Sequence, residues 1–214
     1  MSFFNFGKSG RALLLTVVVA VGLLSVGCGG DDGGNDNPAN NGNNNNNNGG
    51  GGSSETVLLG GLKWMKKNLN VKTADSWCYE NSPDSCLKYG RLYTWEAAKS
   101  ACQSIGMRLP SREEWDALET AVGVDDAGKK LKSKSGWNNN GNGTDDYEFS
   151  ALPGGYRYPN GNFDDVGLGG YWWTATAGDD DGVNCRELDY NYDRIGRYHS
   201  GKDYGASVRC VKDE

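Results

Sequence analysis

The sequence predicts a domain of the α+β class, in which two helices come first and short, mostly antiparallel strands follow. Two segments between residues 94 and 122 carry apolar side chains at helical spacing. The rest alternates short β-prone segments with loops rich in Gly and Asn, and Asn160-Gly161 is a strong signal for a tight hairpin. Helices that precede a strand-rich half are typical of α+β folds.

The first helix is expected over residues 94–105. One face of this segment carries Trp95, Ala98, Cys102 and Ile105. Thr94 is suited to the N-cap and Gly106 to the end of the helix. This face would place Cys102 toward the core.

The second helix is expected over residues 111–122. Ser111 and Glu114 have the spacing of a capping box, in which each side chain bonds the backbone N–H of the other. Its buried face would carry Trp115, Leu118 and Val122, and Gly123 would end it. Strands are expected at residues 56–59, 63–65, 91–93, 156–158, 171–176, 184–190 and 206–211.

The N-terminus looks like a bacterial lipoprotein signal. Lys8 and Arg11 precede an uncharged, mainly apolar segment at residues 12–26, and Gly27-Cys28 follows. At about 15 residues this segment is short for a bilayer-spanning helix. We expect residues 1–27 to be removed and Cys28 to be lipidated, with the protein at the outer membrane or cell surface. An ordinary secretory signal or an uncleaved anchor is the alternative.

Residues 29–54 are almost entirely Gly and Asn. They carry too little apolar surface to offset the entropy of ordering a chain. We therefore expect residues 28–54 to be a lipidated cysteine followed by a disordered tether, with a span of roughly 25–30 Å.

The folded domain is expected over residues 55–214. It contains 20 basic and 25 acidic residues, because Lys8, Arg11 and three Asp residues lie before it. A nucleic-acid-binding surface needs clustered positive charge, so nucleic acid is not an expected partner.

Five cysteines follow Cys28, and an exported location permits disulfides. Cys78 and Cys86 flank a polar segment that a bridge would close into a local loop. Cys102 and Cys210 are the second expected pair, which leaves Cys185 as a free thiol. The spacings are not those of a zinc site, and the chain has a single histidine.

A set of short motifs resembles the Fibrobacter succinogenes major paralogous domain over nearly all of residues 55–214. The motifs, in order, are Tyr89-Gly90-Arg91-Leu92-Tyr93-Thr94-Trp95, Cys102, Arg108-Leu109-Pro110-Ser111, Glu114-Trp115, Gly136-Trp137, Gly143-Thr144-Asp145-Asp146-Tyr147, Phe149-Ser150-Ala151-Leu152-Pro153-Gly154-Gly155 and Ser207-Val208-Arg209-Cys210-Val211. This family is thought to be related to the formylglycine-generating domain, so the resemblance implies a C-type-lectin-like fold and an envelope location. It implies no established activity. The chain departs from the family pattern at Glu148, where glycine is usual, and at the additional Cys185.

Neither an oxygenase nor a hydrolase is expected from the sequence. Formylglycine generators use two neighbouring cysteines with copper, whereas Cys185 and Cys210 are far apart in this sequence. A hydrolase that used His199, Ser200 and Asp203 would need the geometry of a triad, which one Gly-rich segment does not suggest. We therefore expect no catalytic residues and no cofactor.

A binding role agrees better with the aromatic residues of the second half. Lectin-like folds often bind sugars, and aromatic rings stack on apolar sugar faces. The candidate ligand-binding residues are Trp172, Trp173, Tyr190, Tyr192 and Tyr198, with Tyr204 near them. Adjacent residues of a strand face opposite sides, so one of the two tryptophans is expected in the core and the other at the surface. The alternative is that most of these rings fill the core.

Calcium is a further hypothesis, because two loops offer hard oxygen ligands. One loop carries Asn138, Asn140, Asn142, Asp145 and Asp146, and the other is Asp179-Asp180-Asp181-Gly182. Neither has the spaced acidic pattern with a closing Glu, and no metal site is assigned. The sequence thus predicts a surface lipoprotein with a non-catalytic adhesion domain for polysaccharide. A purely structural envelope protein and a degenerate relative of the formylglycine-generating enzymes are the alternatives.

Overall fold

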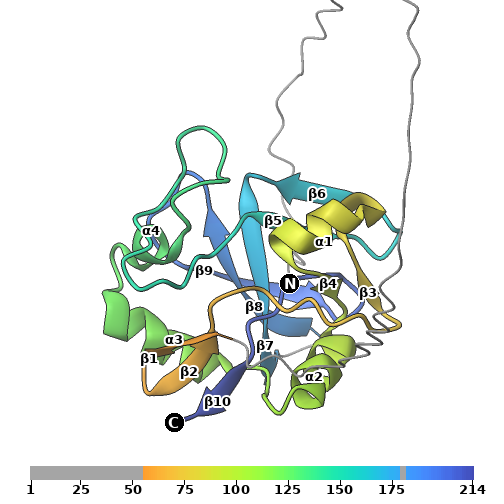
Figure 1. Ribbon diagram of the computed structural model, residues 1–214, viewed down its shortest axis with the longest axis horizontal. Coiled ribbons are helices and arrows are strands. Elements are labelled where there is room, and N and C mark those ends of the chain that lie inside the picture. The colour runs from red at the N-terminus through yellow and green to blue at the C-terminus, as the bar shows by residue number, and fades with distance from the viewer. Residues whose placement is uncertain (1–54, 179–181) are drawn as a thin grey trace, which may run out of the picture. The chain divides into compact units, whose positions relative to one another are not determined.

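The computed structural model describes residues 55–178 and 182–214, and Figure 1 shows their arrangement. The largest sheet has five strands in the order β6-β5-β7-β8-β9. They are β5 (Gly154–Arg157), β6 (Phe163–Val166), β7 (Gly169–Ala177), β8 (Gly182–Asp189) and β9 (Gly196–Gly201). Strands β5 and β7 pair in parallel, and the other neighbours are antiparallel. Together with helices α2 (Trp95–Ser104) and α3 (Arg112–Val122), this mainly antiparallel sheet confirms the α+β class.

A three-stranded sheet joins the two ends of the domain, and it lies beside α3 in Figure 1. It pairs β1 (Thr56–Leu59) with β2 (Leu62–Met65), and β2 with β10 (Val211–Asp213). A third, two-stranded sheet contains β3 (Ser76–Trp77) and β4 (Leu92–Tyr93).

Both expected helices are present. Helix α2 (Trp95–Ser104) begins after Thr94, whose side chain accepts a hydrogen bond from the Ala97 N–H. Helix α3 (Arg112–Val122) begins with the predicted capping box between Ser111 and Glu114, and Gly123 follows its last residue. The hairpin signal is also confirmed, because residues 158–162 form the turn between β5 and β6.

Other elements were not predicted. They are the 3-10 helix η1 (Tyr79–Asn81), α1 (Pro83–Tyr89), α4 (Ala127–Leu131) and the strands β3, β6 and β9. The two additional α-helices have seven and five residues, so neither is long enough to show an apolar period. The expected strand at 206–211 is wrong except for Val211, because Ala206 and Ser207 each bridge a different segment.

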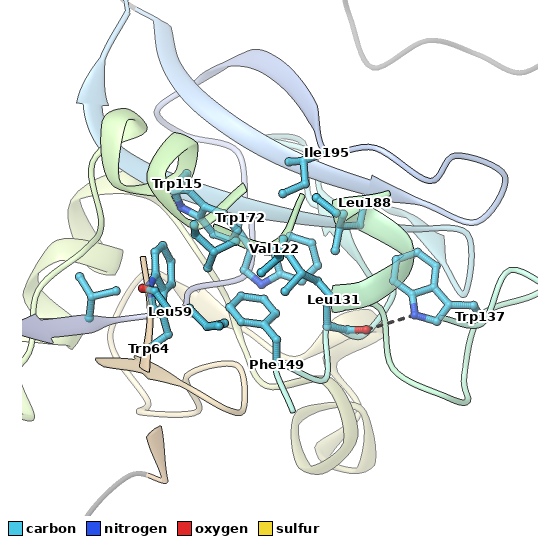
Figure 2. Close-up of a cluster of buried hydrophobic side chains, with 14 residues drawn as sticks. Leu59, Trp64, Trp115, Val122, Leu131, Trp137, Phe149, Trp172, Leu188 and Ile195 are labelled. Atoms are coloured by element: carbon cyan, nitrogen blue, oxygen red, sulfur yellow. Dashed lines mark hydrogen bonds between the residues drawn. The ribbon is translucent and has the colours of Figure 1, made fainter. Parts of the chain in front are cut away.

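The hydrophobic core is built around Trp115 of α3. Its ring lies 4.8 Å from that of Trp64, 6.0 Å from that of Phe149 and 6.3 Å from that of Trp172. Figure 2 shows these rings together, and Trp137 at one side donates a hydrogen bond to the Ala151 carbonyl. Helix α3, both larger sheets and the 127–151 segment therefore share one core.

Both expected disulfides are confirmed. Cys78 is bonded to Cys86, and Cys102 of α2 is bonded to Cys210, which directly precedes β10. Cys185 is a free, buried thiol, and burial raises its pKa. The long disulfide therefore ties the first large helix to the C-terminal end of the domain.

Candidate functional site: a tyrosine–carboxylate surface

One face of the five-stranded sheet packs on the hydrophobic core cluster, and the other carries both buried side chains such as Trp173 and exposed ones such as Tyr198. Trp172 of β7 and Leu188 of β8 belong to the core cluster, as Figure 2 shows. Side chains alternate along a strand, so the neighbouring residues Tyr171 and Glu187 lie on the other face. These two residues are direct partners across β7 and β8.

Four strands and the β8–β9 turn bring tyrosines and carboxylates together on this second face. The Tyr171 hydroxyl donates to Asp165 Oδ2 at 2.8 Å. Glu187 hydrogen-bonds both Tyr171 and Tyr198. We call this group the tyrosine–carboxylate surface, and it consists of Asp165, Tyr171, Glu187, Asp189, Tyr192 and Tyr198.

Glu187 is the most perturbed carboxyl of this surface. Burial disfavours its charged form and raises its pKa to about 7, whereas hydrogen bonds from Tyr198 and Tyr171 oppose that shift. Asp189 and Asp165 add to the rise because they are negative neighbours. Glu187 therefore titrates near neutral pH, which is a property that clusters at functional sites.

The two aspartates of the surface are perturbed in the same direction. Burial raises the pKa of Asp165, and the charge of Asp164 raises it further. Burial also raises the pKa of Asp189, while the charge of Lys132 lowers it. The Lys132 ammonium donates to the carbonyls of Asp189 and Tyr192, and so it fixes the β8–β9 turn.

Two tyrosines give the surface its accessible aromatic area. Tyr192, in the β8–β9 turn, is 65% exposed, and Tyr198 of β9 is 39% exposed. Burial and the charge of Glu187 raise the pKa of Tyr198 to about 12, so its hydroxyl stays protonated and able to donate. The sequence singled out both residues, and the structure brings them to one surface.

The expectation that one of the two adjacent tryptophans is exposed is wrong. Trp172 and Trp173 both have 0% exposure. Both faces of β7 are covered at this point: Trp172 Nε1 donates to Asn68 Oδ1 on one side, and Trp173 Nε1 donates to the Tyr93 carbonyl on the other. Neither ring is available to a ligand in this conformation.

Tyr190 is also directed away from the accessible surface. Its side chain packs against the hydrophobic core cluster, and its backbone N–H donates to the Leu168 carbonyl. The residue is half-buried. Of the five candidate residues, Tyr192 and Tyr198 are therefore the ones that combine exposure with charged neighbours.

Sequence reasoning missed the carboxylates and Tyr171. The alternation of Glu187 and Asp189 along β8 was a usable signal, because it places both on one face. Recognition of Asp165 required the pairing of β5 with β6 and of β5 with β7. A hairpin signal fixes the first pairing, but no local pattern indicates the second, which is parallel.

The rejected triad residues show no catalytic arrangement. His199 and Ser200 are neighbours on β9, so their side chains leave opposite faces of the sheet. The buried Ser200 Oγ has no hydrogen-bond partner among the described residues. Cys210, which the oxygenase hypothesis would need, is bonded to Cys102 instead.

Two of the five candidate calcium ligands in the first loop already accept hydrogen bonds from the protein. Asn142 Oδ1 accepts the Trp137 N–H, and the Asp145 carboxylate accepts both the N–H and the hydroxyl of Ser150. Of the second loop, residues 179–181 lie outside the described residues. Within the described part of the chain, no three His, Cys, Asp or Glu side chains are placed to hold a metal ion.

Comparison with known proteins identifies the family. A family model described as the Fibrobacter succinogenes major domain matches residues 57–212. The chain belongs to this family. No curated protein and no solved structure matches the chain.

The motifs that this major domain shares with its family build the scaffold rather than the surface. Arg108 makes two hydrogen bonds of 2.7 Å to the Glu114 carboxylate and a third to Asp213. Arg209 is fully buried, and burial lowers its pKa to about 9. Its guanidinium donates to four oxygens, which are Asn68 Oδ1 and the carbonyls of Met65, Phe149 and Ser150.

Arg108 and Arg209, which lie in motifs that resemble the family, therefore stabilise the fold of the major domain. None of the six residues of the tyrosine–carboxylate surface belongs to those motifs. Cys28 and the expected signal and tether lie outside the described residues. Within residues 55–178 and 182–214, no helix is sufficiently long and apolar to cross a bilayer.

Proposed function

We propose that the protein is a cell-envelope lipoprotein whose major domain is a non-catalytic adhesion module for uncharged polysaccharide. The observation that carries this proposal is the placement of two exposed tyrosines, Tyr192 and Tyr198, beside the half-buried Glu187. The residues that would contact the ligand are therefore on the β8–β9 hairpin and the adjacent strands.

The chemistry of this surface matches that of a sugar. An exposed tyrosine ring offers a rigid apolar face at low entropic cost, and its hydroxyl both donates and accepts. A carboxylate accepts hydrogen bonds from hydroxyl groups, and such charge-assisted bonds are stronger than neutral ones. Three carboxyl groups on one surface would repel a polyuronate, so an uncharged polysaccharide is favoured over an acidic one.

The C-type-lectin-like fold is part of this proposal. Its support is the α+β arrangement, together with the long irregular segments that link the sheets. A purely structural envelope role would leave the exposed rings without a ligand. A degenerate enzyme is the third possibility.

A hydrolytic role has one specific observation in its favour. A general acid at neutral pH needs a carboxyl whose pKa is raised toward 7, and Glu187 has this property. The test of binding therefore includes an assay for released sugar. Release by the wild-type chain that Glu187→Gln abolishes would replace adhesion with hydrolysis.

The proposal is tested by depletion of the detergent-solubilised full chain on insoluble cellulose and xylan, with pectate as the acidic comparison. The wild-type chain should be retained by a neutral polymer and not by pectate. Tyr192→Ala should reduce retention at least tenfold. Leu87→Ala is the matched control, because Leu87 is 81% exposed and lies on α1, outside the surface.

Two results would contradict the proposal. The first is that neither neutral polymer retains the wild-type chain. The second is that Leu87→Ala and Tyr192→Ala reduce retention equally, since this would indicate non-specific apolar contact.

A further inference from the structure

A concave region lies next to the tyrosine–carboxylate surface, at the tip of the β5–β6 hairpin. It is an open depression of about 540 Å³. Its lining combines two aromatic rings, two amides and two carboxylates. The lining residues are Glu80, Asn81, Tyr158, Gly161, Asn162, Phe163 and Asp164.

One wall of the depression is fixed by the short disulfide. Glu80 and Asn81 belong to η1, which follows Cys78 directly, and Cys78 is bonded to Cys86. Both wall residues have positive φ angles, 52° and 57°, which non-glycine residues adopt at a cost. The bridge holds this wall in a conformation that a free loop would rarely visit.

The other wall is the β5–β6 hairpin, whose aromatic rings are held by neighbouring side chains, one of them from η1. The Phe163 ring lies 5.2 Å from that of Tyr79 and 5.9 Å from the Arg157 guanidinium. The same guanidinium stacks 3.9 Å from the Trp77 ring. The Tyr158 hydroxyl hydrogen-bonds that of Tyr156 at 2.6 Å. A ligand would therefore meet rings that are already ordered, which reduces the entropic cost of binding.

The depression lies at the β6 edge of the sheet, beside the tyrosine–carboxylate surface, and its lining includes residues from both faces of β6. Asp164 lines the depression and is opposite Tyr156 in the β5–β6 pair. The Tyr156 ring lies 5.1 Å from that of Tyr171, which belongs to the surface. Asp164 and Asp165 are consecutive, so the two regions meet at this point of β6.

The depression and the exposed ring of Tyr198 lie far apart across the sheet. Strand β6 is at one edge and β9 at the other, with four strand spacings between them. This places Asp164 and Tyr198 roughly 19 Å apart in the direction across the strands. A monosaccharide in the depression cannot reach the exposed Tyr198 ring, whereas a chain of several sugar units can.

We infer that the depression is a second subsite beside the tyrosine–carboxylate surface and takes a further unit of the same uncharged, extended glycan. This inference rests on the proposed function. Affinity should therefore rise with oligosaccharide length until the ligand reaches from the β8–β9 hairpin to the β5–β6 hairpin, because linked contacts act at a high effective concentration.

The experiment is calorimetric titration of the detergent-solubilised full chain with cello- and xylo-oligosaccharides of two to six units. The test variant is Asn81→Gly combined with Asn162→Ala, which removes both amides and keeps a residue that tolerates positive φ at position 81. Asn139→Gly is the matched control, because Asn139 is exposed, has φ of 53° and does not line the depression.

In the wild-type chain and in Asn139→Gly, affinity should increase at least tenfold from the shortest to the longest ligand. The test variant should bind the shortest ligand as the wild-type chain does and lose this increase. If wild-type and test variant show the same length dependence, the second subsite is refuted while the proposed function stands. If no oligosaccharide binds the wild-type chain, both are refuted.

Discussion

In the strand-rich half of this domain, some aromatic residues are buried in the core and others are exposed. Composition predicted aromatic contacts there, but it could not tell Trp172 from Tyr192. The difference arises from cross-strand packing: Trp172 meets the Trp115 ring of α3, whereas Tyr192 lies in a turn. Whether each ring is buried or exposed therefore depends on its neighbours in the folded structure.

Because Trp172 is buried and Tyr192 is exposed, their replacement should change stability by very different amounts. Trp172→Ala should lower the free energy of unfolding by about 3–5 kcal/mol, because it leaves a cavity in a packed core. Tyr192→Ala should change it by less than about 0.5 kcal/mol, as surface substitutions usually do. Urea unfolding with the disulfides intact measures both. Equal losses would mean that the Tyr192 ring is part of the folded core.

Glu187 predicts a specific dependence of stability on pH. An ordinary glutamate loses its proton near pH 4.5, whereas Glu187 in the folded chain has a pKa of about 7. Between these values the unfolded state binds fewer protons than the folded state, so stability falls as the pH rises. Over this window the wild-type chain should lose on the order of 2 kcal/mol relative to Glu187→Gln, allowing for partial solvent screening.

The measurement is urea unfolding of wild-type and Glu187→Gln chains at pH 4.5, 6 and 8. The variant should lack most of the decrease, because glutamine does not titrate. Parallel profiles for the two chains would show that Glu187 titrates normally and that the surface does not perturb it.

At the scale of elements, the sequence predicted those whose signals are local. The capping box at Ser111 and Glu114 places α3, and Asn160-Gly161 places the β5–β6 hairpin. The five-residue helix α4 has no such signal, because its position depends on backbone bonds such as that from Lys129 N–H to the Asp193 carbonyl. Long-range pairing of this kind leaves no period in the sequence.

The two disulfides should stabilise the domain unequally. Cys78 and Cys86 are 8 positions apart, whereas Cys102 and Cys210 are 108 positions apart. In the chain-entropy model, loops of these sizes are worth about 2.6 and 4.8 kcal/mol. Replacement of both Cys102 and Cys210 by alanine should therefore destabilise the domain more than the same change at Cys78 and Cys86. The opposite order in urea unfolding would refute this assignment.

At the scale of the whole molecule, the family motifs and the candidate surface are separate sets of residues. Buried motif side chains such as Arg209 and Trp115 hold the scaffold, and residues outside the motifs provide the exposed rings and carboxylates. Motif resemblance could therefore predict the family and the domain limits but not the surface.

The N-terminal segment carries the expected lipid anchor. The basic start, the apolar segment and Gly27-Cys28 predict lipid anchoring. Cys28→Ala should move the protein from the membrane fraction to the soluble fraction and abolish incorporation of labelled fatty acid. Membrane retention of the variant, together with an unlabelled wild-type chain, would contradict the anchor.

Binding of an uncharged glycan at the tyrosine–carboxylate surface can be tested by NMR observation of the tyrosine rings during titration. The chain is labelled with ¹³C in its tyrosine rings, and NMR spectra are recorded as cellohexaose or xylohexaose is added. The ring signals of Tyr192 and Tyr198 should shift saturably, while that of Tyr147, which packs on the core cluster, should not. Saturable binding that leaves Tyr192 and Tyr198 unshifted would contradict binding at this surface.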